Sequence, residues 1–468
     1  MSLGANKAAI LGASGGGETA YSIDQSIRFN PSDSCYMSRT QDTAASKQKF
    51  TFSWWMKLGE VDDEMVIISG GASSRWMCRF NTAQQLTFRL TNGTTEKVMT
   101  TDMKFRDLAS WYHCVWTADC TGDISADYSV FYVNGERVAM TGTQPSADTD
   151  FAGYGDATTA SIGCLAHALG VGDFNGYLAE MVLIDNQALT PSSFGELSDD
   201  GIWIPKDVSG LTFGTNGFWV DGRDSSDLGD DESGNGNDWS TSGLASNDQK
   251  PDTPTKNQIT FNPLNNQRSG GTPSNGNLDY VGPSTRTMIT LTANLPTSGK
   301  WCCAFKVEAV SNDAGWQIGV GYADDSDLGD AAGSNEDVSI IRMSTSSSDL
   351  EITDAIAASS IDPSQAIATG DEFWVAQDMG TGKSYLGIYD ASATAMVWIA
   401  NDAGLDGNPS AGTNETKHNS ALAGSDNVVI TVGSKASNAV YLQKSGDVSG
   451  TLPTGYTYFE NVLDLIGS

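Results

Sequence analysis

Short segments in which apolar and polar residues alternate are the feature of this sequence that most limits its fold. They include 51–57 (TFSWWMK), 85–90 (QLTFRL) and 128–133 (YSVFYV). Alternate side chains of a β-strand point to opposite faces of its sheet, so a period of two predicts half-buried strands. Asn134-Gly135 follows the third segment and is the strongest short signal for a two-residue hairpin turn. Short strands separated by frequent turn residues predict an antiparallel sandwich.

The same pattern resumes in the second half of the chain. The expected strands there are 287–291, 300–307, 315–322, 372–377, 385–389, 428–432 and 439–442. The stretch between the two halves lacks the period and is rich in Asp, Ser, Gly and Asn. The sequence therefore predicts an all-β chain of two antiparallel, jelly-roll-like β-sandwich domains, 21–198 and 285–468, joined by an irregular acidic, Asn/Gly-rich bridge over 199–284. The Gly/Ala-rich residues 1–20 are expected to be a docking arm outside both cores.

The charge balance excludes some partners. The chain has 26 Lys plus Arg against 58 Asp plus Glu, a formal net charge of −32. A field of this sign repels polyanions, so we expect neither nucleic-acid binding nor binding to anionic membranes. The surplus of carboxylates is explained most simply by solubility, although one or two loops could use them to hold divalent cations. No run of 18 apolar residues occurs, so no membrane span is predicted.

The seven cysteines show no CxxC pairing and no His partners at metal spacing. Most stand among apolar residues, which is typical of small reduced core residues in a protein made in a cytoplasm. Trp54, Trp55, Trp316 and Trp374 are candidates by residue type for stacking on sugars, but core packing is the alternative for each. Because Trp54 and Trp55 are adjacent in a strand, one of them must face away from the core.

An acidic loop over 221–238 is the best candidate for a small site. Asp231, Ser233 and Asn235 followed by Gly236 match the front of an oxygen-rich calcium loop. Ser242 stands where that loop requires a bidentate Glu, so a complete EF-hand is excluded. We take Asp231, Ser233, Asn235 and Asp238 as candidate Ca²⁺ ligands, and predict no other cofactor. The alternative is a turn held by its own side-chain-to-backbone hydrogen bonds.

Catalytic motifs are weak. Gly380–Ser384 resembles part of a phosphate loop, but Gln377 stands where that motif needs Gly, and two strand-like segments flank it. A glycosidase needs two carboxylates at a defined separation. Glu180 and Asp185 flank one strand, but five positions put them on opposite faces. His113 alternates within an aromatic strand, which favours core packing. We therefore predict no enzymatic activity.

Several segments together resemble a known family. Residues 21–30, 36–40, 133–135, 175–181 and 185–190 are similar to strands of phage tail-fibre modules with a laminin-G-like, concanavalin A-like fold. The bridge segments 230–239 and 252–255 also resemble stretches of such phage proteins. In the second half, 299–307, 315–320 and 370–383 resemble strands and a hairpin of SPRY domains, with Cys302, Cys303 and Ala304 replacing the usual aromatic and acidic residues.

The resemblance implies a non-catalytic structural protein on a bacteriophage virion surface, synthesised in the cytoplasm of the host bacterium. It implies a tail fibre or related appendage that contributes to attachment to host-surface glycans. The arm 1–20 would bind other virion proteins, and a homo-oligomer, with a trimer favoured, would follow from the gain in avidity. Two alternatives stay open, a capsid or head-decoration protein and a glycan depolymerase.

Overall fold

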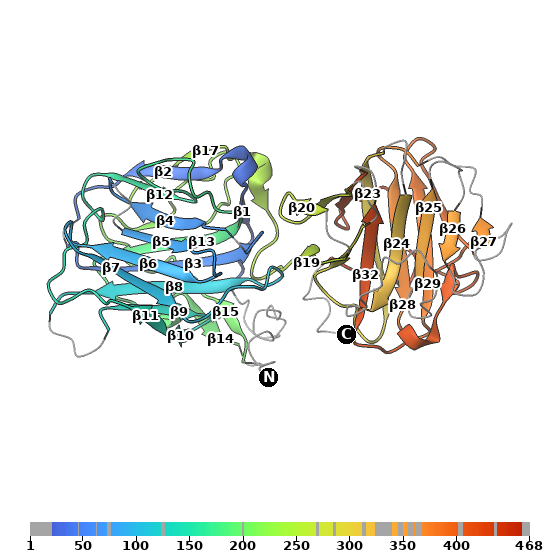
Figure 1. The fold of residues 1–468 in the computed structure, drawn as a ribbon, viewed down its shortest axis with the longest axis horizontal. Helices are drawn as coiled ribbons and strands as arrows, with labels where there is room; N and C mark the ends of the chain where they lie inside the picture. Colours follow the sequence, from blue (N-terminus) through green and yellow to red (C-terminus); the bar gives the residue numbers. More distant parts are fainter. Residues whose placement is uncertain are drawn as a thin grey trace. The chain divides into compact units, whose positions relative to one another are not determined.

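The computed structural model describes most of the chain between residues 21 and 460. Outside the described residues lie 1–20, 45, 62, 73–75, 123–126, 199–200, 268–270, 284–286, 311–314, 323–338, 345–349, 354–358, 362–366, 401–405, 435–437 and 461–468. The predicted docking arm therefore lies outside the described residues. The chain divides into two compact units, Met1–Asn257 and Gln258–Ser468 (Figure 1).

The described residues form β-strands, with four short 3-10 turns and no α-helix. The 3-10 turns are η1 (Pro31–Asp33), η2 (Pro191–Ser193), η3 (Ser246–Asp248) and η4 (Ser420–Leu422). The sheets are antiparallel except where one short strand pairs in parallel. The prediction of an all-β protein with antiparallel sandwiches is thus confirmed. None of the described helices is long and apolar enough to cross a membrane.

Unit 1 contains two large sheets, here named A and B. Sheet A has the order β10 (Glu136–Val138), β9 (Ser129–Val133), β8 (Tyr112–Asp119), β3 (Lys49–Leu58), β13 (Gly176–Asp185), β1 (Ser26–Phe29) and β18 (Gln249–Lys250), with β16 (Phe218–Val220) also paired to β13. Sheet B has the order β11 (Met140–Gly142), β7 (Glu96–Thr101), β6 (Leu86–Thr91), β5 (Trp76–Phe80), β4 (Val66–Gly70), β12 (Thr159–Ile162), β2 (Tyr36–Thr40) and β17 (Ser240–Ser242). A separate pair joins β14 (Gly195–Leu197) and β15 (Trp203–Pro205).

The core of unit 1 lies between sheets A and B and is rich in aromatic rings. The rings of Trp76 and Trp116 stack at 6.1 Å, and Phe50 packs edge-on against Trp116 at 4.8 Å. Trp54 belongs to this core and is fully buried. Aromatic pairs in these geometries stabilise a core beyond the area they bury. The alternating apolar residues recognised in the sequence are therefore the ones that pack between the sheets.

The outer face of sheet A is covered by the chain itself. Trp55 lies there in an apolar cluster with Ile23 and Trp111, and a second cluster on that face includes Phe213 and Trp219. The outward-facing hydroxyl of Thr51 donates to the backbone carbonyl of Gln187 at 2.9 Å. Segments before and after the sandwich thus bury β3 and β13 on both faces, so sheet A offers little surface to a ligand.

Unit 2 also contains two sheets, here named C and D. Sheet C has the order β19 (Phe261–Gln267), β22 (Thr287–Leu291), β32 (Val428–Ser434), β24 (Gly315–Tyr322), β25 (Ser339–Ser344), β26 (Leu350–Thr353) and β27 (Ser359–Ile361). Sheet D has the order β20 (Thr272–Ser274), β21 (Asp279–Val281), β33 (Ala439–Leu442), β23 (Lys300–Ala309), β28 (Glu372–Asp378), β29 (Lys383–Asp390) and β30 (Ala395–Ile399), with β31 (Lys417–His418) on β29 and β34 (Thr457–Tyr458) parallel to β23. Ring pairs such as Trp316 with Phe373, 5.3 Å apart, form part of its core.

A buried carboxylate fixes the C-terminal segment of unit 2 beside sheet D. Glu372 is 1% exposed and accepts hydrogen bonds from the backbone N–H groups of Ser449 and Gly450. It also accepts from the indole N–H of Trp374, a residue that is fully buried. Buried charge is tolerated when several donors share it. Trp374 and Trp316 are both fully buried, so neither can stack on a sugar.

The boundary between the units differs from the predicted domain limits. It lies between Asn257 and Gln258, inside the segment 199–284 that the sequence suggested as an irregular bridge. The described part of that segment is divided between the units: β14 to β18 belong to unit 1, and β19 to β21 to unit 2. Among them, β16, β17 and β18 have two or three residues each and satisfy their backbone groups by pairing with sheets A and B, although they are too short to show a period in the sequence.

Candidate functional site

An open polar face lies on the outside of sheet B, over β5, β6 and β7, which lie side by side (Figure 1). Residues of β6 alternate between buried and half-buried, so every second side chain points away from the core. We call "the open face" the set Arg79, Thr87, Arg89, Val98 and Thr100. Register places Arg79 beside Thr87, Thr87 beside Thr100, and Arg89 beside Val98.

The open face combines guanidinium, hydroxyl and apolar groups. The hydroxyl oxygens of Thr87 and Thr100 lie 3.3 Å apart, and Val98 is 37% exposed. Arg79 pairs with Glu64 at 2.9 Å, and Arg89 pairs with Glu96. Both ion pairs are solvent-exposed, and such pairs contribute only about 0–1 kcal/mol. A ligand can therefore compete for the guanidinium donors.

A loop limits the open face on one side. The hydroxyls of Ser69 and Ser161 donate to the backbone carbonyl of Cys164, at 3.1 and 2.6 Å. The backbone N–H of Ala166 donates in turn to the Ser69 hydroxyl at 2.7 Å. The loop that follows β12 is thus fastened over β4 and β12. The outside of sheet B is accessible at Arg79 of β5 and over β6 and β7.

The predicted calcium residues lie together in a turn that follows β16. Both oxygens of the Asp231 carboxylate accept hydrogen bonds: Oδ1 from the backbone N–H groups of Trp219 and Ser233, and Oδ2 from the Ser233 hydroxyl and the Asn237 N–H. Asp238 accepts from the backbone N–H of Asp231 at 3.2 Å. This geometry is that of a self-supporting turn, the alternative to a calcium loop.

Asn235 is directed away from the other candidate ligands. Its side-chain N–H group donates to the backbone carbonyls of Gly214 and Gly217, at 2.7 and 3.0 Å. Within the part of the chain that the structure describes, no three His, Cys, Asp or Glu side chains are grouped closely enough to hold a metal ion. Calcium binding at Asp231, Ser233, Asn235 and Asp238 stays a prediction of the sequence alone, while the hydrogen bonds favour the self-supporting turn.

Glu180 and Asp185 do not form a carboxylate pair. Glu180 lies at a bulge in β13 where the register shifts between Ala179 and Val182, and its φ is 48°. It accepts a hydrogen bond from the Tyr21 hydroxyl at 2.7 Å. Asp185 instead accepts from the buried Tyr154 hydroxyl at 2.6 Å, among core residues. The two carboxylates thus have separate partners.

The surroundings of Glu180 alter its ionisation. It is 4% exposed, and burial is the main reason why its pKa is raised to about 7, with Asp221 adding to the rise. The Tyr21 hydrogen bond and the charge of Arg223 act in the opposite direction. Arg223 is paired with Asp221 at 3.1 Å. Raised carboxyl pKa values occur in catalytic acids and in buried structural groups alike, so the pKa alone assigns no reaction.

His113 is a buried, neutral core residue. Burial lowers its pKa to about 3, and its ring stacks on Trp55 at 4.6 Å. Its Nε2 lies 2.9 Å from the Ser53 hydroxyl, and Nδ1 accepts from the Trp203 indole N–H at 2.9 Å. The core-packing prediction is confirmed, although the core concerned is the outer cluster of sheet A.

The segment Gly380–Ser384 joins β28 to β29 as a hairpin, with Asp378 paired to Lys383 in register. Asp378 Oδ1 accepts from the backbone N–H groups of Gly380 and Thr381, at 2.9 and 3.2 Å. The hairpin prediction is confirmed, and the phosphate-loop reading has no structural basis. All seven cysteines are buried and free, as the sequence suggested.

The open face was not singled out in the sequence. Its signal was present, because Thr87 and Arg89 are the polar members of an alternating segment. Nothing in a single sequence distinguishes an outward face that the chain itself covers, as on sheet A, from one that stays accessible.

Comparison with known proteins bears on unit 1. Residues 32–193 match the family model described as the concanavalin A-like lectin/glucanases superfamily (Laminin_G_3). Unit 1 contains a concanavalin A-like domain. The matched residues include the whole open face and most of both large sheets. The laminin-G-like fold expected for the first half is confirmed at this level.

Three solved structures are similar to the chain over 36% to 92% of its length. A heptameric pentraxin from Limulus polyphemus is 18% identical, with 36% of this chain and 80% of that chain covered and a TM-score of 0.28. The SPRY domain of human HERC1 is 12% identical, with 40% of this chain and 98% of that chain covered and a TM-score of 0.27. Domains LG4-5 of the mouse laminin α1 chain are 8% identical, with 92% of this chain and 93% of that chain covered and a TM-score of 0.29. No curated protein matches the sequence.

Proposed function

We propose that this chain is a non-catalytic glycan-binding protein that uses the open face of its concanavalin A-like domain. The observation that carries the proposal is the contrast between the two outer faces of unit 1. Sheet A is covered by apolar clusters of the same chain, whereas Arg79, Thr87, Arg89 and Thr100 are half-buried on sheet B with their polar groups outward. A sandwich with one accessible polar face suits an extended, hydroxyl-rich ligand.

The chemistry of the open face suits sugars. Guanidinium groups donate several hydrogen bonds in a fixed plane, and threonine hydroxyls both donate and accept. The exposed Val98 provides an apolar contact for the C–H surface of a sugar ring. None of the five residues of the open face is aromatic, so each contact with a sugar is weak. Useful affinity would come from repeated copies of the chain.

We propose a virion appendage, a tail fibre or related part, as the setting. The support is the resemblance of 21–30, 36–40 and 175–181 to phage tail-fibre modules. In this account residues 1–20 bind other virion proteins, the chain forms a homo-oligomer with a trimer favoured, and the protein acts at the virion surface after synthesis in the bacterial cytoplasm. A head-decoration protein is the alternative for the same binding chemistry.

A glycan array tests the proposal, followed by an assay for newly released reducing ends on every glycan that binds. We expect binding without release. Arg79→Ala should weaken binding about tenfold or more, because a hydrogen bond to a charged group contributes about 1.5–3 kcal/mol. Arg137→Ala is the matched control, since Arg137 is an exposed, ion-paired arginine outside the open face. Release of reducing ends would support the depolymerase alternative instead, and equal losses in both variants would exclude the open face.

A further inference from the structure

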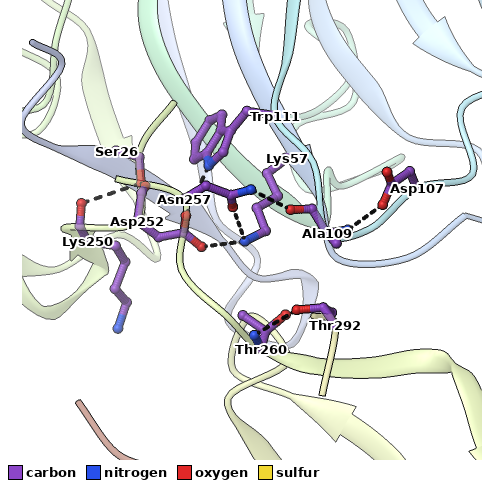
Figure 2. Close-up of polar contacts among 10 residues, drawn as sticks. All are labelled: Ser26, Lys57, Asp107, Ala109, Trp111, Lys250, Asp252, Asn257, Thr260 and Thr292. Atoms are coloured by element: carbon purple, nitrogen blue, oxygen red, sulfur yellow. Dashed lines mark hydrogen bonds and ion pairs between the residues drawn. The ribbon is translucent and has the colours of Figure 1, made fainter. Parts of the chain in front are cut away.

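A buried lysine, asparagine and aspartate lie in direct contact beside the outer face of sheet A (Figure 2). Lys57 Nζ lies 2.9 Å from Asn257 Oδ1 and 2.9 Å from Asp252 Oδ2. The exposed fractions are 1% for Lys57, 2% for Asp252 and 2% for Asn257. Lysine is among the residue types least often buried to this degree. All three residues belong to unit 1.

The surrounding hydrogen bonds hold both partners of Lys57 in place (Figure 2). The indole N–H of Trp111 donates to Asp252 Oδ1 at 3.0 Å, so the other oxygen, Oδ2, faces the amine. The side-chain N–H group of Asn257 donates to the backbone carbonyl of Ala109 at 2.9 Å, which turns the amide oxygen toward Lys57. The Ser26 hydroxyl fixes the backbone of Asp252 at 2.5 Å.

From this arrangement we infer that Lys57 and Asn257 join in an intramolecular amide bond, with Asp252 transferring the protons. The amide carbon of Asn257 is one carbonyl bond, about 1.2 Å, beyond the oxygen that Lys57 already contacts. Fixing an amine and a carbonyl at this separation gives a very high effective concentration of one for the other. The reaction needs no oxidant, metal or cofactor.

The proposed reaction is balanced within the three side chains. Asp252 takes a proton from the Lys57 ammonium, and the freed electron pair of Nζ forms a bond to Asn257 Cγ while the carbonyl π electrons move to Oδ1. A proton passes through Asp252 from Nζ to Nδ2. The Cγ–Nδ2 bond then breaks, the carbonyl re-forms, and ammonia leaves with the bonding electron pair and takes up the remaining proton as ammonium. Asp252 ends as the carboxylate with which it began.

Burial favours this chemistry in two ways. A charged amine and carboxylate lose their hydration in such a site, so transfer of one proton between them relieves a large desolvation cost. Aromatic and apolar neighbours, among them Trp111, Trp55 and Ile23, exclude water that would otherwise solvate the amine. The finished amide is neutral, so the positive charge of Lys57 no longer has to be buried, and Asp252 keeps the hydrogen bond from the Trp111 indole N–H.

The bond would have a mechanical consequence. Asn257 is the last residue of unit 1, and Lys57 lies in β3, which pairs with both β8 and β13 inside sheet A. Tension that reaches unit 1 from residue 258 onward would pass directly into a central strand. The segment after β13 that covers sheet A with Phe213 and Trp219 would then lie inside a closed covalent loop and could not be pulled away first.

Mass spectrometry of the folded full chain tests the inference. We expect a digest to contain one branched peptide that joins the segments around Lys57 and Asn257, with a mass one ammonia below the sum of the two separate peptides. The intact chain should show the same deficit after denaturation. A cooperatively folded wild-type protein that yields the two peptides only in separate form would overturn the inference.

Variants show whether the mass deficit comes from this bond or from another reaction that releases ammonia, such as cyclisation at an Asn-Gly step. Lys57→Arg keeps the positive charge but removes the amine, so the deficit should disappear. Lys49→Arg is the matched control, because Lys49 lies in the same strand and is paired with Asp119; it should keep the branched peptide. Asp252→Asn should leave the two peptides mostly unlinked. A deficit that persists in Lys57→Arg would refute the bond, and full linkage in Asp252→Asn would refute the role of Asp252.

Discussion

Glu180 combines three features at a single residue: a left-handed backbone, a buried carboxyl group and a raised pKa. The φ of 48° belongs to the bulge in β13, where one extra residue changes which side chains face the core. Leu178 and Met181 both face the core although they are three positions apart. No sequence signal predicted this bulge, because β13 is buried on both faces and its apolar residues show no alternation.

The pKa of Glu180 gives a prediction about stability and pH. Its pKa rises from 4.5 to about 7 on folding, mainly because of burial. A carboxyl group that binds its proton more tightly when folded stabilises the folded state below pH 4.5, and this contribution is lost as the pH rises through 7. We expect Glu180→Gln, which resembles the protonated form, to be more stable than wild type at pH 8 by about 3 kcal/mol.

Urea denaturation at pH 5 and pH 8 measures this difference. Glu96→Gln is the control, since Glu96 is 42% exposed in its ion pair and its variant should follow the wild-type pH dependence. If Glu180→Gln and wild type lose stability in parallel between the two pH values, Glu180 does not titrate as described.

At the scale of the elements, the acidic loop is held by hydrogen bonds around Asp231. Four donors converge on its carboxylate, and an asparagine could offer only one acceptor oxygen to them. We expect Asp231→Asn to lower the free energy of unfolding by about 2 kcal/mol or more. Asp224→Asn, in the same loop but exposed, should have a smaller effect, and thermal melts compare the two.

The same contacts predict the response to calcium. A cation at Asp231 would have to displace its N–H and O–H donors, so we expect equal melting temperatures with calcium and with a chelator. If calcium instead raised the free energy of unfolding, by roughly 2.7 kcal/mol at a calcium concentration of 100 times Kd, this would support the ligand set Asp231, Ser233, Asn235 and Asp238.

The strands that the sequence predicted correctly are those in which apolar and polar residues alternate, because only one face of the strand lies in the core between the sheets. Segments such as 51–57 and 128–133, and the Asn134-Gly135 turn, appear in the structure as expected. The short strands of 199–257 were missed because β16 to β18 each have only two or three residues. Such strands form by pairing with a sheet that is already present, which is a property of the tertiary structure. The buried Lys57 had a weak signal, a charged residue two positions after a pair of tryptophans in the same strand.

At the scale of the whole molecule, the unit boundary predicts which fragments fold. Residues 1–257 contain every strand of sheets A and B, and we expect this fragment to melt cooperatively. Residues 1–198 lack Phe213, Trp219 and the partners of Lys57, so the part of sheet A that these residues cover would be exposed. We expect that shorter fragment to aggregate or to lack a cooperative melt. Equal stability of the two fragments would show that the boundary lies near residue 198.

The proposed function of the whole molecule depends on glycan binding at the open face of the concanavalin A-like domain. A crystal structure of the protein with the glycan that binds best on the array tests this most directly. We expect an intact glycan that lies across β5, β6 and β7, with its hydroxyl groups bonded to Arg79, Arg89 or the threonine pair Thr87 and Thr100. A glycan bound only elsewhere, or found cleaved, would contradict it.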